Sequence, residues 1–285
     1  MMGKLFPKVA ILGLGLIGGS IALDLKRKKL AGTVQGFNRS AASRKIALRR
    51  KACDAVFADP AAAVADADLV ILATPVRSIP VLLQAIAPHL KRGALVTDVG
   101  STKENIVRLA KPIIPKGVTF VGGHPIAGTE QTGMQSALTG LFAGRWWVFT
   151  PDTPAARRAT PRLMRLAKAL GAKPLAMSPA EHDQILAAIS HLPHMLAYAL
   201  VHAAMGLQKG KALQLSGSSF RDVTRIAASS ARMWTDIGLD NRREILRMLD
   251  RHDKILKNLK GLLARRDARG LEKFFDSAAQ VRRKL

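Results

Sequence analysis

His124 is the side chain in this sequence best suited to general acid–base chemistry. An imidazole of ordinary pKa can accept a proton from a substrate hydroxyl at neutral pH. It lies in residues 122–130, G-G-H-P-I-A-G-T-E, whose small and polar side chains suit a ligand wall better than a core. The alternative is a histidine that only satisfies a turn. Ser101, in a second polar turn, can hydrogen-bond to an imidazole and fix its tautomer, so we predict His124 and Ser101 as the catalytic residues.

Two further histidines stand in residues 190–194, S-H-L-P-H. His191 and His194 are three positions apart, so they face the same side of a helix. Two imidazoles with no cysteine nearby are a poor ligand set for zinc, and we expect no metal. The alternative is one exposed and one capped histidine around Pro193, which suits His191 better than His194.

Arginines recur in residues 220–227, F-R-D-V-T-R-I-A. Arg221 and Arg225 are four apart and would share one helix face, where either could clamp a carboxylate in bidentate fashion. The alternative is that both only cap and solvate the start of a helix. Trp234 follows, and a tryptophan in such a place is more often part of a core than of a site.

A glycine-rich turn in residues 9–20, V-A-I-L-G-L-G-L-I-G-G-S, predicts the nucleotide site. An apolar strand precedes it and a helix-forming stretch follows, which is the context that the G-x-G-x-x-G fingerprint of dinucleotide-binding folds requires. The first glycine allows a sharp turn, the second lets backbone approach a pyrophosphate, and the third lets helix and strand pack closely. The phosphates would lie at the positive end of the helix dipole. The predicted cofactor-binding residues here are Gly13, Leu14, Gly15, Leu16, Ile17 and Gly18.

The next strand end favours NADP over NAD. A site specific for NAD usually places a carboxylate about 20 residues beyond the glycines, where it binds the ribose 2′-hydroxyl. Asn38 stands there instead, followed by Arg39, Ser40 and Arg44. An amide does not repel a 2′-phosphate, and arginine can bind one. The alternative is that both arginines are merely solvated at a helix start, and NAD use remains possible.

Strands and helices alternate through most of the chain, which predicts an α/β fold with a doubly wound, mostly parallel sheet of the Rossmann type. The third strand ends in Thr74, Pro75 and Val76, at the sheet edge where ligands bind, so these residues are also predicted to hold the cofactor. The predicted strands are residues 9–12, 33–37, 68–74, 95–99, 119–121, 145–150 and 173–177, and the predicted helices include 21–30, 79–90 and 155–170. The turns at 74–75, 100–101 and 123–124 then converge on one end of the cofactor.

No strand pattern follows Ser178, which begins a helix as N-cap, with Pro179 at the first position and Glu181 completing a capping box. We therefore predict two domains, residues 1–178 for the dinucleotide and an all-helical domain of residues 179–285 for substrate and dimerisation.

Composition is that of a globular protein, with 48% hydrophobic and 23% charged residues in 285. A single cysteine, Cys53, excludes an internal disulfide framework and suits a cytoplasmic location. No apolar run approaches the roughly 18 residues of a membrane span, so we expect no membrane partner. The net charge of +25 suggests nucleic-acid binding, but few residues are aromatic and no nucleic-acid motif is present. A solvated basic surface is the favoured interpretation, and no nucleic acid is expected.

Five motifs in this order resemble the prephenate/arogenate (cyclohexadienyl) dehydrogenases of tyrosine biosynthesis. They are G-L-G-L-I-G-G-S, D-V-G-S-T-K at 98–103, G-G-H-P-I-A-G-T-E at 122–130, S-H-L-P-H at 190–194 and F-R-D-V-T-R-I-A at 220–227. The resemblance covers nearly the whole chain and implies oxidative decarboxylation of prephenate or arogenate. It also implies a homodimer formed through the helical domain.

By this resemblance, His124 is the hydrogen-bond acceptor and base at the ring hydroxyl, and Ser101 orients it and touches the substrate. His194 would contact the substrate, and Arg225 would hold a carboxylate. The resemblance also implies roles in shaping the pocket or binding the substrate for a further group of residues. These are Thr129, Glu130, His182, Asp183, His191 and Trp234. Residues 217–219, G-S-S, are less glycine-rich than the corresponding loop of many relatives.

Two other functions compete with this one. A β-hydroxyacid dehydrogenase shares the two-domain plan but would want a catalytic lysine on the first long helix of the second domain, and residues 180–208 contain none. A non-catalytic NADP-sensing or nucleic-acid-binding protein is the rival that the basic charge suggests.

Overall fold

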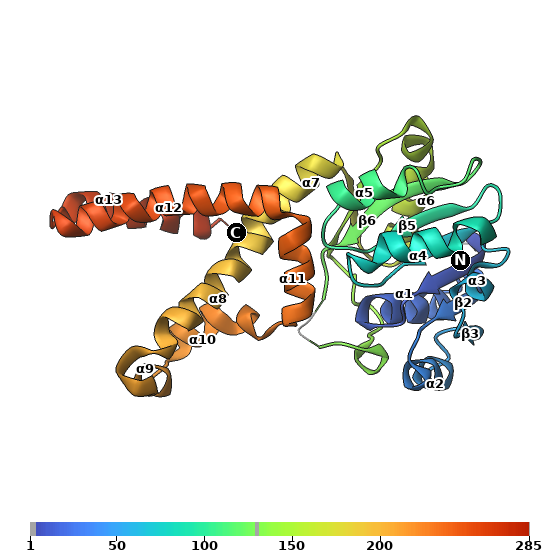
Figure 1. The fold of residues 1–285 in the computed structure, drawn as a ribbon, viewed down its shortest axis with the longest axis horizontal. Coiled ribbons are helices and arrows are strands. Elements are labelled where there is room, and N and C mark those ends of the chain that lie inside the picture. Colours follow the sequence, from blue (N-terminus) through green and yellow to red (C-terminus); the bar gives the residue numbers. More distant parts are fainter. Residues whose placement is uncertain (1–3, 129–130, 285) are drawn as a thin grey trace.

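The computed structural model describes residues 4–128 and 131–284. A sheet flanked by helices forms one part, and helices that extend away from it as two arms form the other (Figure 1). The strands are β1 Phe6–Leu12, β2 Ala31–Phe37, β3 Ala55–Phe57, β4 Leu69–Leu72, β5 Leu95–Asp98, β6 Thr119–Pro125, β7 Trp146–Thr150 and β8 Lys173–Ala176. The sheet order is β3-β2-β1-β4-β5-β6-β7-β8.

The sheet is mostly parallel, as predicted. Strands β1 to β6 pair in parallel, β7 runs antiparallel to β6, and β8 is parallel to β7. The strand order reverses at β1. From β1 the chain first adds β2 and β3 on one side, and then β4 and the later strands on the other side. The carboxyl ends of the strands at such a reversal leave a crevice, and that crevice is where ligands bind in open α/β sheets.

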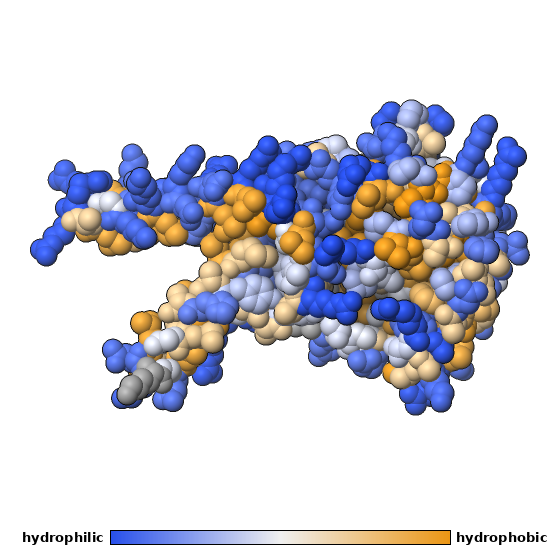
Figure 2. All heavy atoms as spheres, in the orientation of Figure 1, coloured by the Kyte–Doolittle hydropathy of each residue, from blue (hydrophilic) through white to orange (hydrophobic). Residues whose placement is uncertain are grey.

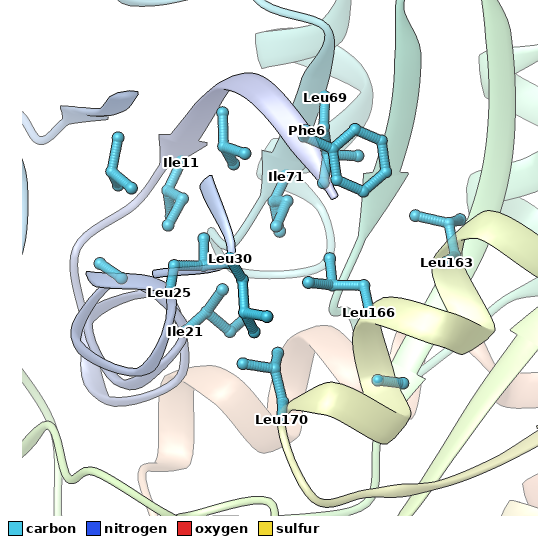
Figure 3. Packing of buried hydrophobic residues seen from close by; sticks show 14 of the residues in the cluster. Phe6, Ile11, Ile21, Leu25, Leu30, Leu69, Ile71, Leu163, Leu166 and Leu170 are labelled. Atoms are coloured by element: carbon cyan, nitrogen blue, oxygen red, sulfur yellow. The ribbon is translucent and has the colours of Figure 1, made fainter. Parts of the chain in front are cut away.

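Helices cover both faces of the sheet because its central strands are apolar on both sides. In β1, Val9 and Ile11 face one core and Ala10 and Leu12 face the other. Figure 3 shows the first core, where Ile11 and Ile71 of the sheet lie in one cluster with side chains of the helices Leu16–Arg27 and Pro154–Ala169. The helices of this part are α1 Leu16–Arg27, α2 Ala41–Arg49, α3 Pro60–Val64, α4 Ser78–Ile86, α5 Glu104–Ala110 and α6 Pro154–Ala169.

Two differences from the sequence prediction concern the residues of the site. Helix α1 begins at Leu16, directly after the second fingerprint glycine, rather than at residue 21. Strand β6 runs on to Pro125, so His124 lies within a strand and pairs with Val148 of β7. The adjacent glycines Gly122 and Gly123 suggested a turn. Gly123 instead lies in the strand, where a larger residue would not fit, because a Cβ there would lie 2.6 Å from the Asp98 carbonyl oxygen.

Beyond Ala176 the described residues form helices and turns and no strand. Ser178 and Glu181 form the predicted capping box. A π turn, Ala187–His191, joins the first two helices just before Pro193, which has no backbone N–H to donate. The helices are α7 Pro179–Leu186, α8 Leu192–Met205, α9 Lys211–Gln214, α10 Ser218–Thr224, α11 Ala231–Asp240, α12 Arg242–Ala264 and α13 Ala268–Arg282.

One helical run in the described part of the chain, Pro179–Met205, is long and apolar enough to cross a membrane by length and composition alone. Its mean hydropathy is 1.3, and 28% of the apolar window is buried. The sequence analysis expected no such run. A helix of this composition also arises where one chain packs against another, so the finding alone is weak evidence for a membrane.

Candidate active site

The glycine turn after β1 has the shape that a dinucleotide requires. Gly13 has φ of +107°, and a Cβ on it would lie 2.3 Å from the Ala73 carbonyl oxygen. A Cβ on Gly18 would lie 2.0 Å from the Gly13 carbonyl oxygen, so both positions need glycine for packing. A Cβ on Gly15 would meet nothing within 4 Å. The protein therefore leaves open space above Gly15, at the uncapped N-terminus of α1, where backbone N–H groups can meet a pyrophosphate.

The other residues of this turn contribute backbone rather than side chains. Leu14 and Leu16 are buried in the protein, and Ile17 is half-buried. Their apolar side chains anchor the turn, so only main-chain groups are left for a ligand. The turn fits the cofactor that the fingerprint predicts.

The end of β2 gathers the four residues predicted to meet the ribose. Ser40 caps α2 by accepting from the Ser43 backbone N–H, and Asn38 Oδ1 accepts from the Ser40 backbone N–H. Arg44 donates to the carbonyl oxygens of Asn38 and Arg39, at 2.8 and 2.9 Å. Arg44 thus braces the turn, while Arg39 is exposed.

The residues after β4 lie beside the glycine turn. A Cβ on Gly13 would come within 3.0 Å of Thr74 Cγ2. The Thr74 hydroxyl is buried and has no hydrogen-bond partner within the described ranges, which leaves it available to a ligand. Pro75 is exposed, whereas Val76 packs into the core with 5% of its surface accessible.

A chain of hydrogen bonds runs from Asp183 to His124. His182 Nδ1 lies 2.8 Å from Asp183 Oδ1, and His182 Nε2 lies 2.9 Å from His124 Nδ1. An ionised carboxylate only accepts, so His182 carries its proton on Nδ1 and must accept at Nε2. His124 then donates from Nδ1, and its Nε2 is left as a hydrogen-bond acceptor.

Burial holds the pKa of His124 well below its usual value of 6.5, and the charges that His182, Lys103 and His191 carry when protonated lower it further. The sequence predicted an ordinary pKa for this residue, and that prediction is wrong. Burial also lowers the pKa of His182, although the Asp183 carboxylate opposes that effect. Both imidazoles are therefore neutral at physiological pH, which the tautomer argument requires.

Ser101 does not orient His124 in this structure. Its side chain makes no hydrogen bond in the described part of the chain, and the partner that fixes the tautomer of His124 is His182. The sequence named His182 and Asp183 only through the family resemblance. The adjacent histidine and aspartate near the start of a helix were the only sequence signal of this pair. The sequence pattern did not predict that His182 would contact His124 in β6.

A buried ion pair fixes the two strand ends that carry Ser101 and His124. Lys103 Nζ contacts Asp98 Oδ2 with both side chains wholly buried, and it donates to the Gly123 carbonyl oxygen at 2.8 Å. Asp98 also accepts from the backbone N–H groups of Gly100 and Gly123. The sequence analysis assigned no role to either residue, because the pairing depends on the packing of β5 against β6.

The histidines of the helical part gather around Trp234. The rings of His194 and Trp234 stack with centroids 3.6 Å apart, and His191 meets the same indole edge-on at 6.0 Å. Both histidines thus share a side, as predicted, but His191 is buried rather than exposed. Trp234 is 7% exposed and belongs to a core, yet its indole N–H has no partner within the described ranges. Trp234 therefore packs in the core and can also donate its indole N–H to a ligand.

Arg225 lies beside His194, whose pKa its charge helps to lower, after the larger effect of burial. Helix α10 ends at Thr224 and Arg225 begins a 3₁₀ turn, so Arg221 and Arg225 do not share one regular helix. Thr129 and Glu130 lie outside the described residues. No group of three or more potential metal ligands occurs within the described ranges.

Family models match both parts of the chain. The nucleotide-binding domain of prephenate dehydrogenase matches residues 21–175, and the dimerization domain of prephenate dehydrogenase matches residues 178–277. Prephenate dehydrogenase of Bacillus subtilis is 35% identical over 99% of this chain and 76% of its own length. Cyclohexadienyl dehydrogenase of Zymomonas mobilis is 35% identical over 97% of this chain and 95% of its own.

Solved structures agree. Prephenate dehydrogenase from Aquifex aeolicus, in complex with hydroxyphenyl propionate and NAD+, has a TM-score of 0.92 at 31% identity, over 98% of each chain. Synechocystis arogenate dehydrogenase has a TM-score of 0.84 at 32% identity, over 97% of this chain and 99% of that one. A 3-hydroxyisobutyrate dehydrogenase shares only the fold, at 19% identity. This chain belongs to the prephenate dehydrogenase family, and it is an oxidoreductase with a nucleotide-binding domain and a dimerization domain.

Proposed function

We propose that this enzyme carries out the oxidative decarboxylation of prephenate, arogenate or both, with NADP as its preferred cofactor and His124 as its base. The observation that carries the proposal is the hydrogen-bonded chain from Asp183 through His182, which leaves His124 Nε2 as an acceptor. A substrate hydroxyl needs such an acceptor when the carbon that bears it loses hydride. A nicotinamide cofactor, when bound at the glycine turn, would supply the acceptor for this hydride.

His124 takes the ring hydroxyl proton as hydride leaves the same carbon, so that carbon becomes a carbonyl. Loss of the ring carboxylate as CO2 then sends its electron pair into the ring, and the carbonyl oxygen regains the proton from His124 to give a phenol. The low pKa of His124 suits this sequence, because a protonated imidazole in that buried place readily returns its proton. Aromatisation supplies the driving force, so the protein mainly positions the groups.

Substrate carboxylates are proposed to bind at the helical side of the site. Arg225 offers a guanidinium there, and Trp234 offers a buried N–H without a partner in the described structure. His194 Nδ1 lies 2.9 Å from the Ser190 carbonyl oxygen, so its neutral form donates there and accepts at Nε2. Ser101, His191, Thr129 and Glu130 complete the proposed substrate set.

The preference for NADP rests on the end of β2. Asn38, Arg39, Ser40 and Arg44 bring an amide, a hydroxyl and two cations to the start of α2. A 2′-phosphate is attracted by cations and by a helix N-terminus, and it meets no carboxylate among these four residues.

The test is kcat/KM for prephenate and for arogenate, each with NADP+ and with NAD+, followed at the nicotinamide absorbance. We expect turnover of at least one substrate and a kcat/KM about tenfold or more higher with NADP+. Equal or better use of NAD+ would overturn the cofactor assignment. Silence with both substrates, in a protein that binds nucleic acid with a steep salt dependence, would favour the nucleic-acid-binding rival.

We also propose a cytoplasmic homodimer formed through the helical domain. Figure 2 shows apolar side chains on the facing sides of the two helical arms and hydrophilic side chains along the outer edge of the α12 arm. Exposed apolar residues of the helical part include Ile189, Leu200, Leu246, Leu263, Phe275 and Val281. A second copy would cover them, which also accounts for the apolar run Pro179–Met205 without a membrane. Light scattering that gives the mass of a monomer would contradict this.

A further inference from the structure

Asn241 donates two hydrogen bonds from one amide nitrogen. Its Nδ2 lies 2.9 Å from the Asp183 carbonyl oxygen and 3.1 Å from His191 Nδ1. A carbonyl oxygen only accepts, so the amide nitrogen and not the amide oxygen faces Asp183. The same nitrogen therefore faces His191, and His191 Nδ1 has to accept. The remaining ring nitrogen of His191, Nε2, then carries the proton.

His191 is positioned to use that proton on a ligand. Its ring is 1% exposed and lies edge-on to Trp234, in the group that includes His194. Its Nε2 has no hydrogen-bond partner in the described part of the chain, so the N–H is available. Burial lowers the pKa of His191 to about 4, and the ring is neutral at physiological pH.

His124 and His191, two of the three buried histidines of the site, thus have opposite hydrogen-bonding character at Nε2. His124 accepts at Nε2 because its Nδ1–H donates to His182, while His191 donates at Nε2 because its Nδ1 accepts from Asn241. We propose that Asn241 is a positioning residue that holds His191 as a neutral hydrogen-bond donor to a substrate oxygen. This rests on the proposed function, in which the substrate carries carboxylate oxygens near His194 and Arg225.

Asn241 is held firmly enough for this role. It is 4% exposed and stands at the corner between α11 and α12. The adjacent Asp240 accepts hydrogen bonds from Thr102, in the turn after β5, and from Asn105 of α5. The corner that joins the helical part to the sheet is therefore also the corner that sets the tautomer of His191.

Asn241→Asp tests this with almost no change of shape. A carboxylate at that place only accepts, so the neutral His191 ring has to move its proton to Nδ1, and Nε2 loses its donor. At pH 8.5 we expect KM for the substrate to rise about 10- to 100-fold, with a smaller effect on kcat and unchanged cofactor affinity. At pH 6, protonation of His191 beside the new carboxylate restores an N–H at Nε2, and the KM defect should shrink.

A structural defect would not produce this dependence on pH. Asn258→Asp is the matched control, because the same chemical change falls on an exposed position of α12. Nitrogen-15 NMR of labelled histidine gives a direct readout, since we expect His191 to be protonated at Nε2 in the natural protein and at Nδ1 in the variant at pH 8.5. The His191→Gln variant, which removes the ring, assigns its signal.

A second pair keeps the test decisive if Asn241→Asp fails to fold. His191→Gln retains an amide N–H near the position of Nε2, whereas His191→Leu has no donor, so we expect the glutamine variant to have at least a tenfold lower KM. An Nδ1–H tautomer in the natural protein, an unchanged KM in Asn241→Asp, or equal KM for the His191 pair would each overturn the inference. If the natural protein turns over neither substrate, the proposed function fails, while the NMR tautomer still decides the role of Asn241.

Discussion

The nucleotide end of this site is made from the backbone of one short stretch, whereas the substrate end is made from side chains that come from distant elements. Gly13, Gly15 and Gly18 contribute because they have no side chain, and all three lie within six residues of the chain. By contrast, 58 residues separate His124 from His182, and another 58 separate Asp183 from Asn241.

This difference determines which changes would disrupt each end of the site. Backbone N–H groups have one chemical state, so the phosphate end depends only on shape and on the helix N-terminus. An imidazole has two neutral tautomers, and its neighbours decide which nitrogen accepts. The substrate end therefore depends on a hydrogen-bond network, and a change of one atom in Asp183 or Asn241 can reverse it.

The largest expected effect separates the two ends directly. His124→Asn keeps an amide near the position of Nδ1 but removes the acceptor at Nε2, so kcat should fall about 1,000-fold. Cofactor affinity, measured by fluorescence titration, should stay within about twofold, because the glycine turn is untouched. A variant with nearly full activity would remove His124 as the base.

Two alanine substitutions in the turn sharpen the same comparison from the other side. Gly18→Ala places a Cβ 2.0 Å from the Gly13 carbonyl oxygen, so the backbone must shift and the melting temperature should fall by about 10 °C or more. Gly15→Ala meets nothing within 4 Å and should melt normally, yet bind cofactor about tenfold more weakly. Normal cofactor affinity in Gly15→Ala would show that the open space is not where the pyrophosphate binds.

Acid should weaken the substrate end through its buried histidines. In the unfolded chain His191 takes up a proton near pH 6.5, whereas in the folded protein it does so only near pH 4. The unfolded state binds more protons between these values, so stability is lost as pH falls through that window, by about 3 kcal/mol for this residue. Urea unfolding at pH 7 and pH 4.5 measures the loss, which should be smaller in His191→Gln.

The smallest effect concerns the carboxylate site. Arg225→Ala should raise KM about tenfold and leave kcat within a few-fold, because binding and not chemistry is lost. The exposed Arg221→Ala is the matched control. An unchanged KM in Arg225→Ala would remove that residue from the carboxylate site.

Much of the fold was predictable because it follows from local patterns. Apolar runs predicted the strands, and Ser178 with Glu181 predicted the start of the helical part. The short strand β3 was missed, since three residues carry too little pattern. The site was predictable only in part. His124 was found, but its expected partner Ser101 was replaced by His182, and the buried pair of Lys103 and Asp98 was not assigned.

The amino-acid sequence by itself determined the nucleotide turn, the alternation of strands and helices, and the residue types that reach the substrate. These depend on steric limits and periodicities that act over a few residues. Only the tertiary structure decided that His124 accepts and His191 donates. A proton on a buried ring goes to the nitrogen that its neighbours leave free, and those neighbours, His182 and Asn241, come from other parts of the chain.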